Sequence, residues 1–420
     1  MSYPINQAIT YTASALTAGM PLDTFTYAWT FDDSGTGNIA SLAHTWTTAG
    51  VHSATVTATD VQTLGAATAT KSINITDYST LAWTNSGLKI CAATSSLQGN
   101  ATESIVSGTK LINVVDYYTN RAVVSVDTQS LIRVENTTCF PVVCSGGILL
   151  SSGANSGKIL CFMGDGSLHY GFLDPTTLVY TQSSNSMAQV AWTNSLNCFA
   201  RSIYIDYHRI LICSQTSNSY GAGVSQIYDT LTDTYTSMSS PPYISYISIV
   251  KIGNNVIGIR DNSAVTDLFN ITTLTWSSFG PPLLGGYALG PFRAGYINPA
   301  YAGNTNGLVV LIASGPYNSI ATWDGVTATW TQGAAYPIAS VGWTSIYGCM
   351  FIPCSDGMLM DVYPYGSSPL VERTKTELYQ QSYFTTVAWP SLGWIYRTAY
   401  CNNRAWIAGY DGILYYSTPV

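Results

Sequence analysis

Apolar and polar residues alternate from residue 4 to about residue 76, and the spacing of the apolar residues shows no helical periodicity. In one predicted strand, Phe25, Tyr27, Trp29 and Phe31 fall on the same face. In a later strand, over residues 51–59, mostly Thr and Ser on one face oppose mostly Ala and Val on the other. Since successive side chains of a strand point to opposite faces, this pattern predicts an antiparallel β-sandwich with half-buried sheets.

The same region resembles a PKD domain in three segments that follow one another in the order of that family. They are the strand and turn Tyr27-Ala-Trp29-Thr-Phe31-Asp32-Asp33, the segment His44-Thr-Trp46-Thr-Thr-Ala-Gly50, and the strand Val56-Thr-Ala-Thr-Asp60. Thr30, Asp32 and Ser34 depart from the family's usual aspartate and two glycines, which changes the turn but not the framework. The resemblance implies an Ig-like β-sandwich that serves as a spacer or interaction module without a catalytic role. For Asp32, Asp33 and Asp60, calcium binding stays open, but roles in turns and caps are favoured.

Beyond residue 78 a short unit recurs, in which a strand ends at Asp or Asn and a second strand follows, usually rich in Thr with a Trp or Tyr. The unit begins at Asp127, Asp174, Asp229, Asn270 and Asp324, and weaker copies lie at 360–373 and 410–412. An Asp or Asn at the start of a turn can accept hydrogen bonds from the following backbone, so we predict turns rather than catalysis for these residues. The mean spacing of about 47 residues is typical of the four-stranded blades of a β-propeller.

Outer strands near residues 83, 133, 180, 235, 276, 330 and 372 predict seven blades, with six and eight as alternatives. The stretch Thr80-Leu-Ala-Trp83-Thr84 looks like an outer strand detached from its blade, and its pairing with the last blade would close the ring. We therefore predict an all-β chain with an Ig-like PKD domain over residues 1–77 and a propeller over 78–420. The repeated unit resembles degenerate kelch repeats, although the glycine pair of that family is mostly missing.

Charged residues make up only 9% of the chain, and the formal net charge is −7. The polar surface is therefore expected to come from Thr, Ser, Asn, Gly and the 30 tyrosines, as suits extracellular or virion proteins. The 15 basic residues form no cluster, which argues against a nucleic-acid partner. No apolar run approaches the roughly 18 residues of a membrane span, and the N-terminus lacks the pattern of a secretion signal.

The nine cysteines cannot all pair within one chain. Cys139 and Cys144, like Cys349 and Cys354, are separated by four residues, so on a straight strand the two sulfurs would lie on opposite faces. Zinc binding needs closely paired cysteines or neighbouring histidines, and the sequence offers neither. Buried free thiols are therefore favoured over disulfides.

No pattern in the sequence specifies a catalytic site, a metal site or a cofactor. His169 and His208, the two histidines of the predicted propeller, are expected at the surface or at the edge of the core. The segment 280–301 is rich in Gly, Pro and aromatic residues, and it serves equally well as a binding loop or as a packed connection between blades. Its candidate contact residues are Tyr287, Phe292, Tyr296 and Tyr301, because aromatic side chains provide contact area at low entropic cost.

These features favour a non-enzymatic virion surface protein, such as a phage capsid decoration, a head fibre or a component of a tail adhesin. Its expected partners are other virion proteins and host surface glycans, without nucleic acid and without insertion into a membrane. Two alternatives stay open: a secreted carbohydrate-active enzyme with a PKD accessory module, and a cell-surface adhesin.

Overall fold

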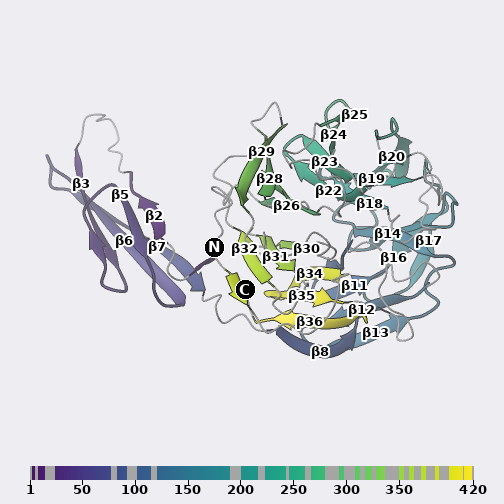
Figure 1. The fold of residues 1–420 in the computed structure, drawn as a ribbon, viewed down its shortest axis with the longest axis horizontal. Coiled ribbons are helices and arrows are strands. Elements are labelled where there is room, and N and C mark those ends of the chain that lie inside the picture. The colour runs from purple at the N-terminus through teal and green to yellow at the C-terminus, as the bar shows by residue number, and fades with distance from the viewer. Residues whose placement is uncertain are drawn as a thin grey trace. The chain divides into compact units, whose positions relative to one another are not determined.

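The described residues of the computed structural model form β-strands and no helix (Figure 1). They are residues 2–4, 8–14, 24–76, 83–91, 102–114, 121–189, 200–215, 223–242, 246–260, 266–279, 397–409 and 411–418, together with the strands that lie between residues 293 and 386. This part of the chain has no helix long and apolar enough to cross a membrane. Contacts divide the chain into two compact units, Met1–Leu81 with Val420 and Ala82–Pro419.

In the N-terminal unit, two sheets pack around one aromatic core. The larger sheet has the strand order β1-β7-β6-β3-β4, and the smaller sheet pairs β2 with β5. The strands are β1 (Ser2–Pro4), β2 (Ala8–Thr12), β3 (Phe25–Phe31), β4 (Thr36–Gly37), β5 (Ser41–Thr45), β6 (Gly50–Asp60) and β7 (Ala66–Thr76). The core includes Ile9 and Tyr11 of β2, Trp29 and Phe31 of β3, and Trp46 just after β5. The β-sandwich predicted from the alternation is therefore confirmed.

Threonines pair across the long strands β6 and β7. The hydroxyl groups of Thr55 and Thr70 lie 2.9 Å apart, and those of Thr57 and Thr68 lie 3.0 Å apart. Each pair joins residues that face each other in the register of the two strands. Such cross-strand pairs stabilise a sheet, and they let this one present polar groups without charged side chains.

Six sheets of the second unit are antiparallel, with four successive strands that pair in sequence order, and a seventh sheet has five strands. Sheet 1 contains β10 (Ile105–Ser107), β11 (Lys110–Asn113), β12 (Val123–Asp127) and β13 (Ile132–Asn136). Sheet 2 contains β14 (Cys144–Leu149), β15 (Ile159–Met163), β16 (Tyr170–Leu173) and β17 (Tyr180–Gln182). Sheet 3 contains β18 (Arg201–Tyr204), β19 (Arg209–Gln215), β20 (Gly223–Asp229) and β21 (Thr234–Ser237). Sheet 4 contains β22 (Tyr246–Ile252), β23 (Asn255–Arg260), β24 (Thr266–Asn270) and β25 (Thr275–Ser278). Sheet 5 contains β26 (Arg293–Ile297), β27 (Leu308–Ile312), β28 (Tyr317–Trp323) and β29 (Ala328–Ala335). Sheet 6 contains β30 (Met350–Pro353), β31 (Leu359–Tyr363), β32 (Leu370–Thr374) and β33 (Phe384–Thr386). Sheet 7 has the order β8-β36-β35-β34-β9, with β8 (Trp83–Lys89), β9 (Thr102–Glu103), β34 (Arg397–Cys401), β35 (Arg404–Ala408) and β36 (Ile413–Ser417).

The first strands of sheets 1 to 6 and β34 of sheet 7 follow one another in a closed ring. Strand β10 contacts β14, and the contacts continue through β18, β22, β26, β30 and β34, which returns to β10 (Figure 1). Four-stranded sheets arranged in this way around one axis form a β-propeller, so the predicted fold class is confirmed. The described residues contain seven such sheets, and the number of blades in the complete chain stays a prediction.

Most of the predicted outer strands are correct in position, and one is wrong. Those near residues 83, 133, 180, 235, 276 and 330 lie in β8, β13, β17, β21, β25 and β29. The segment near residue 372 is β32, the third strand of sheet 6, and β33 pairs outside it. The weak copy at 410–412 is also displaced, because Asp411 lies between the second and third strands of sheet 7, β35 and β36. Alternation identifies a strand but not its place within a sheet.

The ring closes where a strand from the start of the second unit joins strands from its end. Strand β8 pairs antiparallel with β36, and Trp83 lies opposite Ser417. The predicted closure by the strand around Trp83 is therefore confirmed. The pairing also covers the edge of β36, which would otherwise expose unpaired backbone groups.

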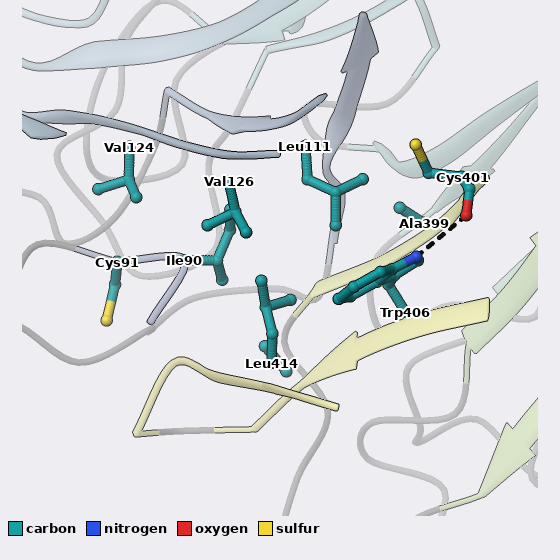
Figure 2. Close-up of a cluster of buried hydrophobic side chains, with 10 residues drawn as sticks. Ile90, Cys91, Leu111, Val124, Val126, Ala399, Cys401, Trp406 and Leu414 are labelled. Carbon is teal, nitrogen blue, oxygen red and sulfur yellow. Dashed lines mark hydrogen bonds between the residues drawn. The ribbon is translucent and has the colours of Figure 1, made fainter. Parts of the chain in front are cut away.

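A buried core lies at this closure, between sheets 7 and 1 (Figure 2). Trp406 is fully buried there, and its indole nitrogen donates a hydrogen bond of 3.1 Å to the carbonyl oxygen of Cys401. Across the same junction, the buried guanidinium group of Arg397 donates to the side-chain oxygen of Asn113 at 3.0 Å. The core consists of Ile90, Cys91, Leu111, Val124, Val126, Ala399, Cys401, Trp406, Ala408 and Leu414.

Candidate interaction surface

Four of the recurring Asp and Asn residues begin the turn between the third and fourth strands of their sheets. The Oδ1 atoms of Asp127, Asp174, Asp229 and Asn270 each accept hydrogen bonds of 2.7–3.2 Å from the backbone N–H groups two and three residues on. The bond from the N–H three residues on is the main cause that lowers the pKa of Asp127 and of Asp174. Asn270 has the same role without a charge. The predicted turn function is confirmed for these four residues.

The fifth residue of this turn has a left-handed backbone conformation in all four sheets. Leu131, Leu178, Asp233 and Leu274 have φ angles of 55, 55, 54 and 56°. This conformation is unfavourable for a residue with a Cβ atom, so the surrounding hydrogen bonds and packing must hold it. The same backbone geometry therefore recurs with different side chains, which marks the turn as scaffold.

The turn at Asp324 lies outside the described residues. Its flanking strands β28 and β29 pair with Trp323 opposite Ala328. These strands are therefore paired in the expected place, while the turn and the hydrogen bonds of Asp324 stay a prediction.

The tyrosines of the described residues mostly pack between sheets instead of forming the polar surface expected from composition. Tyr170, Tyr228 and Tyr235 gather between sheets 2 and 3, with ring centroids 4.8–6.0 Å apart. The hydroxyl groups of Tyr170 and Tyr228 donate to one carboxylate oxygen of Asp233, at 2.7 and 2.9 Å. Burial is the main cause that raises the pKa of Tyr170 to about 12. Their large apolar rings fill the space between twisted sheets, so the expectation of surface tyrosines was wrong for this part of the chain.

The carboxylates of the N-terminal unit bind backbone and side-chain groups close to them. Asp33 accepts from the backbone N–H of Gly35 at 3.1 Å. Asp60 accepts from the Thr63 hydroxyl at 2.6 Å, the main cause that lowers its pKa, and from the following backbone at 2.8 Å. Asp32 accepts from the backbone N–H of Ser53 at 2.9 Å. Asp33 and Asp60 thus have the turn and cap roles favoured by the sequence, whereas Asp32 binds the neighbouring strand β6. No group of three or more metal-ligating side chains stands together among the described residues.

Two histidines of the same unit stack on core aromatic rings and contact the carboxylates. His44 stacks on Phe31 at 3.8 Å between ring centroids, and His52 stacks on Trp46 at 4.4 Å. The Nε2 atom of His44 lies 2.9 Å from a carboxylate oxygen of Asp33.

His52 lies between two hydrogen-bond acceptors. Its Nδ1 atom is 3.0 Å from an oxygen of Asp32, and its Nε2 atom is 2.9 Å from the carbonyl oxygen of Thr48. Both partners only accept, so both bonds form when both ring nitrogens carry a proton. Burial lowers the pKa of His52, but these bonds and the nearby negative charges outweigh it and raise the pKa above its ordinary value.

No disulfide joins the described cysteines. They are Cys91, Cys139, Cys144, Cys161, Cys213 and Cys401, whereas Cys198, Cys349 and Cys354 lie outside the described residues. The prediction of free thiols instead of a Cys139–Cys144 disulfide is confirmed. Burial raises the pKa of the Cys139 thiol to about 12, so little reactive thiolate forms there at neutral pH.

The contact residues predicted in segment 280–301 cannot be assembled into one loop. Tyr287, Phe292 and Tyr301 lie outside the described residues. Tyr296 lies in the innermost strand of sheet 5, where β26 pairs it with Val309 of β27. The expectation of one continuous loop is therefore wrong for residues 293–297, because that stretch pairs as a strand.

Among the Phe, Trp and Tyr side chains whose exposure the structure describes, one is exposed. Tyr207 is 72% exposed and lies in the hairpin between β18 and β19. The ring nitrogens of the next residue, His208, lie 3.5 Å from a carboxylate oxygen of Asp206 and 3.6 Å from one of Asp229. Arg209 donates to Asp206 at 2.6 Å. Burial raises the pKa of Asp206, but the bonds from Arg209 and the hairpin backbone outweigh it, and the net pKa is lowered.

Sequence reasoning assigned His208 to the surface or core edge and passed over Tyr207. The local signal is the order Asp-Tyr-His-Arg at 206–209, which puts an aromatic ring among charged side chains in a hairpin. Exposure of that ring depends on the neighbouring sheets, which no local pattern describes.

Comparison with known proteins identifies the first unit. The family model of the PKD domain matches residues 4–76. This unit is a PKD domain. Its two sheets, its aromatic core and its histidine–aspartate contacts are thus features of a PKD domain in this chain, and no curated protein sequence matches the chain.

Several solved structures resemble the chain at low sequence identity. The β-propeller domain of Nup133 from Vanderwaltozyma polyspora has a TM-score of 0.49 at 9% identity, covering 81% of this chain and 98% of its own. The β-propeller domain of the Trilobed protease from Pyrococcus furiosus has a TM-score of 0.44 at 11% identity, covering 77% and 95%. An auxiliary nutrient binding protein from Bacteroides thetaiotaomicron has a TM-score of 0.41 at 10% identity, covering 99% and 95%. The propeller assignment rests on the strand pairing and the ring of inner strands, not on these similarities.

Proposed function

We propose that this protein is a non-enzymatic adhesion or interaction protein displayed on the surface of a virion. A PKD domain together with a propeller suggests a protein-interaction or adhesion module. The observation that carries the proposal is the use of the recurring acidic side chains. In four sheets the repeated Asp or Asn binds backbone N–H groups of its own turn, so the most conspicuous repeated chemistry of the chain maintains the scaffold.

The composition and the thiols support the location. Only 9% of the residues are charged, and the PKD domain has paired threonines across its long strands, which suits a protein exposed outside the cell. No disulfide joins the described cysteines, whereas extracellular proteins that fold along an oxidising route usually pair theirs. Folding in a reducing cytosol followed by release within a particle reconciles these two features. Capsid or tail proteins would then be its structural partners, and host surface glycans its external ligands.

Fractionation of the producing culture tests the location. An antibody raised against the recombinant chain is used on density-purified virus particles, on particle-free lysate and on the culture medium. The proposal predicts the protein in the particle fraction at a constant ratio to the major capsid protein. Recovery of the protein only from the particle-free lysate or the medium would refute it and would favour a secreted enzyme or a cell-surface adhesin.

A second assay addresses the enzymatic alternative. Purified protein is incubated with a panel of polysaccharides, and the release of reducing ends and of unsaturated products is measured. The proposal predicts the same background as a heat-denatured sample, and reproducible turnover that depends on folded protein would overturn it.

A further inference from the structure

The hairpin between β18 and β19 holds Tyr207 at the surface in a fixed backbone. One carboxylate oxygen of Asp206 accepts from the backbone N–H groups of His208 and Arg209, at 3.0 and 2.8 Å. The carbonyl oxygen of Tyr207 itself accepts from the hydroxyl of Ser152, in sheet 2, at 2.9 Å. These bonds come from within the hairpin and from the neighbouring sheet, so the backbone that carries the tyrosine side chain is already ordered.

A turn next to the hairpin adds a further support. The backbone N–H of Thr230 donates to the carbonyl oxygen of His208 at 2.8 Å, and the Thr230 hydroxyl lies 2.6 Å from that of Ser152. Ser152 and Thr230 are both buried. An ordered backbone reduces the entropy lost on binding, because only the two side-chain torsions of Tyr207 have to be fixed.

The fold does not require this hairpin to be so long or to carry an aromatic ring. The equivalent hairpins of sheets 1, 4 and 7 join their first two strands through two residues each, Gly108-Thr109, Gly253-Asn254 and Asn402-Asn403, whereas the hairpin of sheet 2 is longer and spans residues 150–158. Sheet 3 uses four residues, 205–208, and puts Tyr207 near the tip. A single exposed ring is common on protein surfaces, so what distinguishes Tyr207 is the ordered hairpin backbone that carries it.

The groups around Tyr207 distinguish the kind of ligand. Asp206, His208, Arg209 and Asp229 are each about one-third exposed at the side chain. Centres of protein–protein interfaces are depleted in charged residues and need far more apolar area than one tyrosine supplies. A sugar residue needs one apolar surface for the C–H groups of its ring face and polar groups for its hydroxyls, and this site offers both.

We propose that Tyr207 binds a sugar residue of a neutral glycan through the face of its ring, with the hydroxyls hydrogen-bonded by the Asp229 carboxylate and by His208. The inference deepens the proposed adhesive function and rests on it for the biological role of the glycan. The Tyr207 hydroxyl has no part in the stacking, since the ring face makes the contact. The carboxylates also disfavour an acidic sugar, which the net charge of −7 would repel further.

Saturation-transfer NMR of the full-length protein tests this site. The probes are the methyl glycosides of glucose, galactose, mannose and N-acetylglucosamine at millimolar concentration, with sialic acid as the acidic comparison. We expect transfer to the ring protons of at least one neutral glycoside. Tyr207→Phe keeps this signal, whereas Tyr207→Ala weakens the affinity by up to about tenfold, the loss of one stacking contact. Leu64→Ala, which truncates a side chain of similar exposure in the PKD domain, leaves it unchanged.

Three results would overturn the inference: no transfer to any neutral glycoside, equal affinity in Tyr207→Ala and the wild type, or loss of binding in Leu64→Ala. Loss of particle association in Tyr207→Ala without any sugar binding would instead assign the ring to a protein contact. Because Tyr207 is exposed, its variants are expected to keep the thermal midpoint of the wild type, which verifies folding. Sugar binding and recovery in virus particles are measured separately, so failure of one is distinguishable from failure of the other.

Discussion

Replacing Leu178 by glycine separates the contributions of backbone strain and side-chain burial to the stability of the repeated turn. Leu131→Gly is the matched control. Both leucines are the fifth residue of the turn, and both have a φ of 55°. They differ in burial, since Leu178 is 1% exposed in the core between sheets 1 and 2, whereas Leu131 is 40% exposed. The two substitutions therefore relieve the same backbone strain but remove different amounts of packing.

The magnitudes follow from that difference. Glycine in the left-handed region avoids a cost of about 1 kcal/mol that leucine incurs. Truncating a fully buried leucine costs about 2–5 kcal/mol, so Leu178→Gly should lower the free energy of unfolding by about 1–4 kcal/mol. Leu131 buries less of its side chain and loses roughly 1 kcal/mol of burial, so the relief of strain cancels most of the loss.

Equilibrium urea unfolding of the full-length chain, followed by tryptophan fluorescence, measures both variants. We expect Leu178→Gly to move the propeller transition to clearly lower urea and Leu131→Gly to leave it near the wild-type midpoint, with unchanged slopes. An equal loss in the two variants would show that the leucine at this position acts through the backbone and not through burial. A gain of stability in Leu178→Gly would refute the assignment of Leu178 to the core.

Three further predictions concern single contacts. Asp174→Asn should keep the urea midpoint, because Asn270 has the same role in sheet 4. Asp174→Ala should lower the free energy of unfolding by about 1 kcal/mol, because it leaves two backbone N–H groups without their acceptor. Equal losses in the two variants would contradict this role. Gly153→Ala should lower the thermal midpoint much more than Gly157→Ala, although both glycines have a positive φ, 79° and 84° respectively. Only a Cβ atom at residue 153 would overlap a backbone oxygen of the neighbouring sheet. Similar losses in the two variants would disprove that overlap. In imidazole NMR of the full chain, the pKa of His52 should lie above the ordinary value of about 6.5. The contribution of His52 to stability is therefore present below about pH 6.5 and is lost as the pH rises through the raised pKa. A pKa at or below about 6.5 would contradict the two proposed hydrogen bonds.

Features that depend on a few consecutive residues could be predicted from the sequence. The turn at Asp174 follows from a side chain that binds the backbone two and three residues on, and the PKD core follows from alternation in strands such as Phe25–Phe31. The closing strand at Trp83 was also predictable, because a strand without a neighbour in sequence must find one elsewhere. The assignment of residues near 372 to an outer strand failed because third and fourth strands of a sheet share the same alternation.

The strands, the repeated turns, the PKD domain and the propeller class follow from local sequence, because hydrogen bonds within a turn and alternation within a strand act over a few residues. Which side chains meet between sheets depends on the tertiary structure. Leu131 and Leu178 have the same place in the same turn, yet one is partly exposed and the other is buried by the next sheet. Tyr207 and Tyr170 are likewise the same residue type, but Tyr207 is exposed on a hairpin and Tyr170 is buried between sheets 2 and 3. Burial depends on which surfaces the ring of sheets brings together, and residues far apart in the chain supply those surfaces.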